Sequence, residues 1–348
     1  MTDVDVAVVG GGIIGALAVR ELLDRAPGRR IALLERDVVG AGASGRSAGL
    51  HFPRGATARV RALSAAGEDF YARLRAADPT VPIHPLDAVV IGGDVGKVYL
   101  DRPVPVPVDR VPDEVVVPEG ARAWSVAGCH YADVGALTAT LVRRLRPHAD
   151  VREGVAVVAV EPAADEVRLV LGTGDVVRAG SVVLAPGPWV HAPAWHDLVA
   201  PLGLRVKLVV ALHVDRVPPP DAPLVVLHDD DSFLLPVRHR GHWLFSHTST
   251  RWDVRPDELT GGLSADMLAE GRAALARHAP ASLPLATSGR VFCDAYSPAR
   301  EPVVQALDPA CRVVFAGAAN GSGYRLGPAI ASAAADLALE PAVQRNHA

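Results

Sequence analysis

Short apolar runs bounded by glycine mark the places where the chain predicts buried strands. The first run contains Val4, Val6, Val8 and Val9 and stops at a group of glycines. Continuous runs of this kind are typical of strands buried on both faces of a parallel sheet. Runs of similar character lie at residues 31–34, 181–185 and 312–317. The pattern predicts a parallel sheet built from both ends of the chain.

Helical spacing of apolar residues appears between the strand signals. Residues 56–77 place Val60, Leu63, Phe70 and Leu74 on one face of a helix. Further helices are predicted after Gly15 and at residues 135–146, 263–279 and 328–339. The last of these begins with Pro328, which a first helical turn tolerates.

Alternating apolar residues predict a second, antiparallel unit. Residues 79–118 are rich in proline and contain short alternating runs, which is typical of edge strands. Other strand signals lie at residues 155–160, 167–171, 206–214, 224–228, 233–237 and 243–247. The predicted fold class is therefore α/β, with a Rossmann-like nucleotide-binding domain that holds a parallel sheet and a small crossover sheet. An α+β substrate domain is built on a mixed or antiparallel sheet. The boundaries expected are 1–78, 128–200 and 300–348 for the first domain, and 79–127 and 201–299 for the second.

The glycines after the first strand form a dinucleotide-binding pattern. Gly10, Gly12 and Gly15 give G-x-G-x-x-G between a strand and a helix. Such glycines permit a tight turn, a close approach to a pyrophosphate and close helix packing, and the helix directs its positive end at the anion. Glu35 ends the next strand, where an acid can accept hydrogen bonds from a ribose. Because Glu35 would repel a 2′-phosphate, NAD or FAD is expected.

A loop of small residues follows at positions 40–49. Its glycines let the backbone lie against a flat ligand, and Ser44, Arg46 and Ser47 can donate to phosphate.

Composition limits the remaining classes of function. The chain has 348 residues, 49% of them hydrophobic, and a formal charge of −4. Lysine occurs only at Lys97 and Lys207, and no basic stripe with aromatic residues is present, so nucleic-acid binding is not expected. Three separated cysteines indicate reduced thiols without a disulfide frame or a metal site. The apolar start lacks a basic flank and is too short for a membrane span. We expect a cytoplasmic protein, as a monomer or small homo-oligomer.

Three stretches together resemble the FAD-dependent oxidoreductases of the D-amino-acid oxidase, sarcosine oxidase and glycine oxidase superfamily. They are residues 5–22 with Glu35, residues 42–51 and residues 316–331. Residues 45–67 and 231–245 are also similar to D-arginine dehydrogenases. The resemblance implies FAD and the oxidation of a carbon–nitrogen bond in an amine or amino-acid substrate, with hydride transfer to the flavin giving an imine. Oxygen or another electron acceptor would reoxidise the flavin. The alternatives are oxidation of a 2-hydroxy acid, an NAD-dependent dehydrogenase, and an FAD-binding protein that uses the flavin structurally or for partner recognition.

The resemblance also implies which residues contact the cofactor. Those expected to do so are Gly10, Gly12, Ile13, Ile14, Gly15, Glu35, Arg36, Ser44, Gly45, Arg46, Ser47, Ala48, Gly49, Leu50, Val157, Ala185, Gly187, Trp189, Gly321, Ser322, Gly323, Tyr324, Arg325 and Leu326.

Five residues are the candidates for substrate binding and catalysis. Arg325 lies where the family has a basic residue that holds the substrate carboxylate, which an arginine can do with two parallel hydrogen bonds. Tyr324 and Tyr296 are expected to form the wall of the substrate pocket, and Arg290 is a second carboxylate candidate. His51 lies one position from a histidine of D-arginine dehydrogenases. His228 and His247 end predicted strands and are further candidates for residues that face the flavin.

Two departures from the family pattern limit these expectations. Cys293 lies one position from the cysteine that attaches FAD in sarcosine oxidases, so we expect non-covalent FAD. Ala299 replaces an aspartate that is common in the family. No acid or base stands out for proton removal, which suits hydride transfer from a neutral amine.

Overall fold

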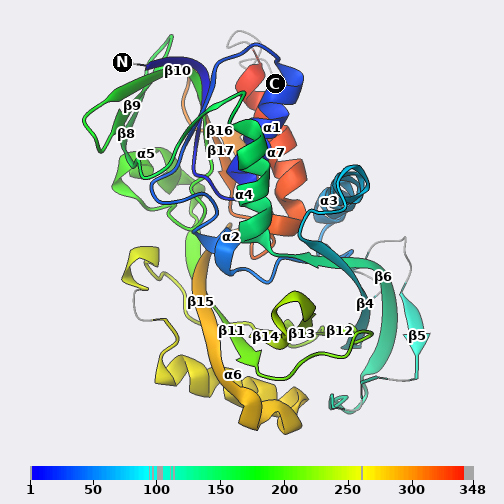
Figure 1. Cartoon of the computed structure of the whole chain (residues 1–348). Coiled ribbons are helices and arrows are strands. Elements are labelled where there is room, and N and C mark those ends of the chain that lie inside the picture. Colours follow the sequence, from blue (N-terminus) through cyan, green and yellow to red (C-terminus); the bar gives the residue numbers. More distant parts are fainter. Residues whose placement is uncertain are drawn as a thin grey trace.

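The computed structural model describes residues 2–93, 95, 98–99, 105–109, 111–112, 114–259 and 262–340. Parts of the predicted segment 79–118, and residues 341–348 of the predicted first domain, lie outside the described residues. Two large sheets are visible in Figure 1, one above the other, and the helices α1, α4 and α7 lie together beside the upper one.

The first sheet is the predicted parallel sheet. Its strands have the order β16-β17-β10-β1-β2-β7, and β8 and β9 extend it from β10. Strands β17, β10, β1, β2 and β7 run parallel, which confirms the predicted core, and β8 with β9 forms an antiparallel extension. The bounds are β1 Thr2–Val9, β2 Ile31–Leu34, β7 Asp150–Arg152, β8 Val157–Pro162, β9 Val167–Leu171, β10 Val176–Leu184, β16 Val303–Ala306 and β17 Val313–Gly317.

Helices α1 (Ile13–Arg25), α4 (Val134–Leu145) and α7 (Gly323–Leu339) lie beside one face of this sheet, and α3 (Ala58–Ala77) packs on α7. Val6, Val8, Leu17 and Leu137 belong to the core that they share. Side chains at the N-termini fix where helices begin, because Thr57 and Asp133 accept hydrogen bonds from the first turns of α3 and α4.

The second sheet is mixed, as the sequence predicts. Its order is β15-β11-β14-β13-β12-β4-β6-β3, with β5 paired to β6, and only β12 and β4 run parallel among its named pairs. The bounds are β3 Leu50–His51, β4 Ile83–Gly92, β5 Val106–Val108, β6 Arg122–Ala132, β11 Arg205–Val214, β12 Leu224–Leu227, β13 Ser232–Val237, β14 His242–His247 and β15 Ala286–Tyr296. Helix α6 (Ala265–His278) packs on this sheet. The sheet therefore recruits β3 from the predicted first domain, and the expected boundary at 127/128 falls within β6.

The remaining helices are short. They are α2 (Ala43–Arg46), α5 (His196–Val199) and the 3₁₀ turns Pro193–Trp195, Ala200–Leu202, Arg238–Arg240, Pro256–Glu258 and Pro280–Leu285. Within the described part of the chain, no helix combines the length and the apolar character needed to cross a bilayer.

The last helix departs from the prediction at its start. Helix α7 begins at Gly323, so Pro328 lies inside the helix and not in its first position. A proline there removes the N–H that would bond to the carbonyl of Tyr324. That carbonyl instead accepts a hydrogen bond from the hydroxyl of Tyr71, and this replacement explains why the helix tolerates the proline.

Candidate active site

A cavity of about 770 Å³ lies where the two sheets meet. Its wall includes the N-termini of α1 and α7, the loop before β3, and strands β11, β13, β14 and β15. The volume lies in the upper part of the range of about 300–1,000 Å³ that is typical of ligand and cofactor pockets. The N-termini of two helices therefore line one cavity.

The glycine pattern forms the tight passage from β1 into α1. Gly10 has a φ of +107°, and a Cβ atom there would lie 2.2 Å from the carbonyl oxygen of Ala185. A Cβ atom on Gly15 would lie 1.9 Å from the carbonyl oxygen of Gly10. Larger residues cannot occupy either position without moving the backbone. The start of α1 is therefore shaped as a dinucleotide site requires.

Two polar side chains organise the same helix start. The hydroxyl of Ser44 accepts a 3.0 Å hydrogen bond from the N–H of Ile13. The carboxylate of Glu35 accepts one of 2.6 Å from Gly11 and one of 2.8 Å from Asp37. Glu35 is thus held at the end of β2, beside the glycine turn, as a ribose-binding acid would be.

Most of the residues expected to contact a cofactor line this cavity. These are Gly12, Ile13, Ile14, Gly15, Ser44, Ser47, Ala48, Gly49, Leu50, Ala185, Gly187, Gly321, Ser322, Gly323, Tyr324, Arg325 and Leu326. The remaining seven are not among its lining residues: Gly10, Glu35, Arg36, Gly45, Arg46, Val157 and Trp189.

Three of those seven have other surroundings. Arg36 lies over the ring of Trp189, 4.1 Å from its centroid, and both side chains bond to Asp257. Val157 is the first residue of β8 and belongs to a hydrophobic core. The side chains of Arg36, Trp189 and Val157 therefore act in packing here.

Arg325 lies in the cavity wall at the start of α7. Its guanidinium group lies 4.7 Å from the centre of the Phe52 ring, and one terminal nitrogen donates a 2.6 Å hydrogen bond to the Ser322 hydroxyl. Nε and Nη1 are buried and have no hydrogen-bond partner among the described residues. Burial, followed by the nearby charge of Arg54, lowers the pKa of Arg325 to about 10. Arg325 is therefore a buried cation with two nitrogen atoms, Nε and Nη1, that can still donate hydrogen bonds.

Arg54 is a cavity residue that the sequence did not reveal. Its guanidinium group lies 6.0 Å from the centre of the same Phe52 ring, so Arg54 and Arg325 flank one aromatic side chain. Arg54 also forms an ion pair of 3.3 Å with Asp231. The charge of Arg54 also acts on Arg325, so the two side chains make this part of the cavity wall positive.

Lys207 and Asp294 also line the cavity and were not predicted. Lys207 is 8% exposed, and its ammonium group lies 5.1 Å from the ring centre of Trp252 and 5.6 Å from that of Tyr296. Burial lowers its pKa. Asp294 lies opposite Lys207 in the pairing of β11 and β15, and burial raises its pKa to about 6. The cavity therefore holds an acid that titrates near neutrality, although the sequence offered none.

Two catalytic candidates have side chains packed in the core. His51 is fully buried and absent from the cavity wall, because the short strand β3 turns its side chain toward α3 and β6. His51 is therefore not among the lining residues of the cavity, whereas its neighbour Leu50 is. Tyr324 contributes to the wall, but its ring packs on Tyr71 with centroids 4.3 Å apart, within the core. Tyr324 is therefore a core aromatic.

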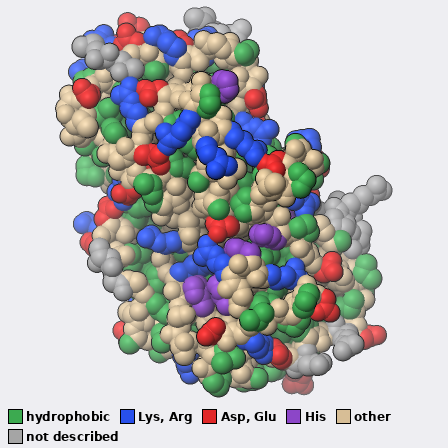
Figure 2. Space-filling view, in the orientation of Figure 1, with side chains coloured by type: hydrophobic (Ala, Val, Ile, Leu, Met, Phe, Trp, Pro, Cys, Tyr) green, Lys and Arg blue, Asp and Glu red, His purple; other side chains and the backbone are tan. Residues whose placement is uncertain are grey.

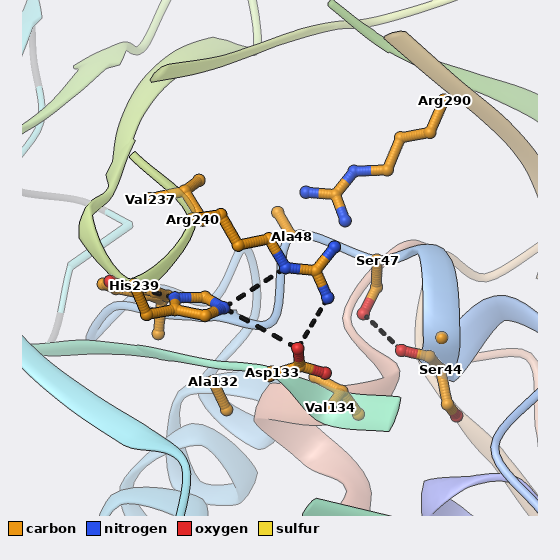
Figure 3. A pocket seen from close by; sticks show the side chains of 12 residues that line it. Ser44, Ser47, Ala48, Ala132, Asp133, Val134, Val237, His239, Arg240 and Arg290 are labelled. Carbon is orange, nitrogen blue, oxygen red and sulfur yellow. Dashed lines mark hydrogen bonds and ion pairs between the residues drawn. The ribbon is translucent and has the colours of Figure 1, made fainter. Parts of the chain in front are cut away.

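Arg290 lies in a second, smaller pocket and not in the main cavity. This pocket has a volume of about 10 Å³ and is bounded by Arg240, Asp133 and the Ser44–Ala48 loop. Figure 3 shows Arg290 beside this pocket with no contact to the other side chains drawn, whereas Arg240 pairs with Asp133 at 2.6 Å. Arg290 belongs to β15 and comes two positions before the first residue of that strand in the cavity wall. It therefore lies beyond the end of the cavity. Arg290, the second carboxylate candidate, is therefore not among the residues that line the main cavity.

The other candidates divide between the two environments. Tyr296 and His247 line the main cavity, and His228 does not. Cys293 packs in a hydrophobic core, where burial raises the pKa of its thiol to about 12. Figure 2 shows basic and histidine side chains gathered over the second sheet. His239, Arg240 and Arg290 belong to this group around the second pocket.

The cavity residues that sequence analysis did not identify differ in how readily the sequence could have indicated them. Lys207 interrupts the apolar run of β11, and a lysine inside a buried strand indicates a functional position. Arg54 and Asp231 lie 177 positions apart and meet only through the fold. No local pattern identifies that pair.

The parallel sheet, the glycine turn and the cavity between two sheets define a nucleotide-dependent enzyme with a substrate pocket beside its cofactor site. Residues 5–337 match the DAO family, described as FAD-dependent oxidoreductase. The chain therefore belongs to this family of FAD-dependent oxidoreductases, and the NAD-dependent alternative is set aside.

Known proteins support the same assignment. The chain is 29% identical over 240 residues to the formaldehyde-forming 4-methylaminobutanoate oxidase of Paenarthrobacter nicotinovorans, a match that covers 61% of this chain and 27% of that protein. The matched region is thus only about a quarter of that relative.

Two solved structures have the same fold. The open form of NikD, an unusual amino acid oxidase essential for nikkomycin biosynthesis, gives a TM-score of 0.80 at 20% identity and covers 98% of this chain and 95% of that one. Glycine oxidase from Geobacillus kaustophilus gives 0.79 at 18% identity, with 97% and 95% covered.

Proposed function

We propose that the protein oxidises the carbon–nitrogen bond of an amino acid, or of a secondary or cyclic amine, that carries a carboxylate. The observation that carries the proposal is the state of Arg325, a cavity guanidinium with two buried nitrogens left without a partner. An unpaired buried charge costs several kcal/mol, so a site that keeps one is built for an anionic ligand. The carboxylate of the substrate supplies that anion.

The shape of the cofactor site fits FAD. Gly10 and Gly15 leave no room for a Cβ atom, and the first residues of α1 and α7 line one cavity. Bound FAD supplies the acceptor for the hydride of the carbon that bears the amine, and the substrate leaves as an imine. Arg325 and Arg54 hold the carboxylate, and Phe52 and Phe233 keep water from the apolar side of the pocket.

The named relatives support oxidation at nitrogen-bearing carbon. One is a methylaminobutanoate oxidase and two structural neighbours are amino-acid oxidases. A 2-hydroxy acid would use the same carboxylate anchor, so the anchor alone does not separate the two substrate classes.

Anaerobic flavin bleaching tests the proposal directly. The purified holoprotein is mixed with amino acids, N-methyl amino acids, cyclic imino acids and the matched 2-hydroxy acids. We expect loss of the oxidised flavin band near 450 nm with an amine substrate that carries a carboxylate, and not with the hydroxy acid. Bleaching by the hydroxy acids alone would replace the proposal with the alternative. Reoxidation of the bleached protein by oxygen or by a dye then identifies the acceptor class.

We also propose that FAD is held without a covalent bond. Cys293 is the cysteine nearest in sequence to the attachment site of sarcosine oxidases, and its thiol lies in a core, away from the cavity wall. Acid precipitation should release the yellow colour into the supernatant. A yellow pellet would contradict this expectation.

A further inference from the structure

The second pocket carries more positive charge than its own acid balances. It lies between the loop at residues 44–48, the end of β6, the turn between β13 and β14, and β15. Arg240 and Arg290 are its cations, and Asp133 is the only acid among the described residues that line it. Two guanidinium groups therefore share one carboxylate in this pocket, at a surface where basic and histidine side chains gather (Figure 2).

The carboxylate of Asp133 is already engaged by other groups. It accepts a 3.0 Å hydrogen bond from the N–H of Ala136 at the start of α4. It also accepts a 2.6 Å hydrogen bond from Arg240, and Nε2 of His239 lies 3.6 Å from it. These contacts make Asp133 the N-cap of a helix and the counter-ion of Arg240. Asp133 therefore neutralises one of the two arginines.

Arg290 is left without a counter-ion in the pocket. Its Nε atom is buried and has no hydrogen-bond partner among the described residues, and Figure 3 draws no contact from it to the other lining side chains. Burial, followed by the charge of Arg240, lowers the pKa of Arg290 to about 10. The strand fixes its position, because Arg290 lies opposite Ala211 in the pairing of β15 with β11. A partly buried cation held in this way costs free energy until an anion joins it.

Three neighbouring histidines are affected by the same excess of positive charge. Burial lowers the pKa of His213, His239 and His242, and the charges of Arg240 and Arg290 lower all three further. Neutral imidazoles are therefore favoured around the pocket, and the two guanidinium groups remain as the cations that a ligand would meet. An anion bound there would offset the repulsion among all five side chains.

We propose that the second pocket binds the oxyanion group of a small molecule, a phosphate or a carboxylate, through Arg240 and Arg290. Planar guanidinium groups donate parallel hydrogen bonds that match the oxygens of such a group. The pocket volume of about 10 Å³ admits about one water-sized group, so one oxygen enters and the remainder of the ligand faces solvent. Ser44, Ser47 and Ala48 line both this pocket and the main cavity, so the anion would lie against the loop that forms part of the cavity wall.

Calorimetric titration of the purified holoprotein with inorganic phosphate tests the site, at an ionic strength held constant with chloride. We expect saturable binding to the wild type that is about tenfold weaker or more in Arg290→Gln, because charge-assisted hydrogen bonds are lost. Arg143→Gln, an exposed arginine of α4, is the matched control and should bind as the wild type does. Arg325→Met alters the main cavity and should also retain this binding.

The same titrations can overturn the proposal in two ways. Binding that is lost in Arg325→Met but kept in Arg290→Gln would place the phosphate in the main cavity. A wild-type protein that shows no saturable binding of phosphate would reject the site altogether. Because the readout is binding and not oxidation, failure of this proposal is distinguishable from failure of the proposed function.

A crystallographic measurement covers the case in which Arg290→Gln does not fold. Crystals of the wild-type holoprotein are soaked in selenate, whose anomalous signal locates the anion. We expect a peak within hydrogen-bond distance of Arg240 and Arg290, and a peak only elsewhere would reject the site. Competition between phenyl phosphate and inorganic phosphate then separates two sources of the oxyanion, and either result supports the site. Competition indicates the terminal group of a larger molecule, and its absence indicates the free ion.

Discussion

The hydroxyl of Tyr71 donates a 2.8 Å hydrogen bond to the backbone carbonyl of Tyr324. This carbonyl is the one that Pro328 leaves without its helical donor. Tyr71 is fully buried in α3, so the bond joins that helix to the turn that carries the next residue, Arg325. A side chain of one helix thus supplies the hydrogen bond that the backbone of another helix lacks at the edge of the active site.

Removing this hydroxyl should affect both stability and substrate binding. We expect Tyr71→Phe to lower the free energy of unfolding by about 1–3 kcal/mol, the cost of a buried carbonyl left unpaired. Because the first turn of α7 would shift, KM for a carboxylate substrate should rise. Tyr131→Phe is the control, since its hydroxyl accepts from the Arg238 backbone in the second sheet. That variant should lose stability while KM stays unchanged, and equal KM changes in both would argue against a local effect.

Replacing Arg325 should remove the anchor for the carboxylate. Arg325→Met is expected to lower kcat/KM by an amount that corresponds to a loss of about 2–5 kcal/mol in transition-state stabilisation, as truncation of one partner of a buried charge pair does. The loss should be much smaller for an analogue of the substrate without the carboxylate. Arg300→Gln removes an exposed arginine of the same cavity wall and should change kcat/KM little. Unchanged kinetics in the Arg325 variant would reject its role.

The sequence predicted the fold where local patterns suffice. The runs at β1, β2, β10 and β17 are continuous and apolar, and they form parallel strands of one sheet. The start of α7 was misplaced because a proline normally marks a first turn, and only the distant Tyr71 makes it acceptable further in. Local rules fail where a contact from another element replaces a local bond.

The site shows the same division. The glycine turn and Arg325 lie in compact motifs, so the sequence identifies them. Arg54 and Asp231 pair across 177 positions of the sequence. His51, Glu68 and His130 come from three different elements. No spacing of residues along the chain predicts either group. Sequence could not decide which of Leu50 and His51 lines the cavity, because that depends on a strand of only two residues.

Asp294 gives the flavin reduction a testable pH dependence. Its carboxyl lines the cavity with a pKa raised by burial to about 6. If Asp294 accepts the proton of the substrate amine, the rate of flavin reduction rises as pH increases through about 6, because only the ionised carboxylate is a base. Stopped-flow measurements should show this limb in the wild type and lose it in Asp294→Asn. Asp253→Asn, an exposed aspartate, should retain it. A limb that persists in Asp294→Asn belongs to the substrate amine, and the reaction then proceeds without an enzyme base.

Replacing a glycine of the turn between β1 and α1 should sharply weaken cofactor binding. Gly15→Ala would place a Cβ atom 1.9 Å from the Gly10 carbonyl oxygen, so α1 must move away from β1. We expect the purified variant to be colourless or to bind FAD far more weakly, as judged by the ratio of absorbance at 450 and 280 nm. Gly93→Ala is matched to it, because no atom lies within 4 Å of the added carbon. Full FAD content in the Gly15 variant would show that α1 does not meet the cofactor.

Buried histidines should make the fold sensitive to acid, and His213 allows the sign to be tested. Burial, followed by the neighbouring His242, lowers the pKa of His213 to about 4, from a usual value of 6.5. Between these two values the unfolded chain binds a proton that the folded chain does not. The contribution of neutral His213 to stability is therefore complete above pH 6.5 and is lost as pH falls toward 4.

The effect is measurable by denaturant unfolding at pH 7 and pH 5. Each pKa unit corresponds to about 1.4 kcal/mol, and after allowance for partial exposure we expect His213 to account for about 1 kcal/mol of the decline over this interval. His213→Gln should show a smaller decline than the wild type, because glutamine does not titrate. His148→Gln, an exposed histidine of the loop after α4, should decline as the wild type does. A decline in His213→Gln equal to that of the wild type would mean that His213 is already accessible to protons in the folded protein.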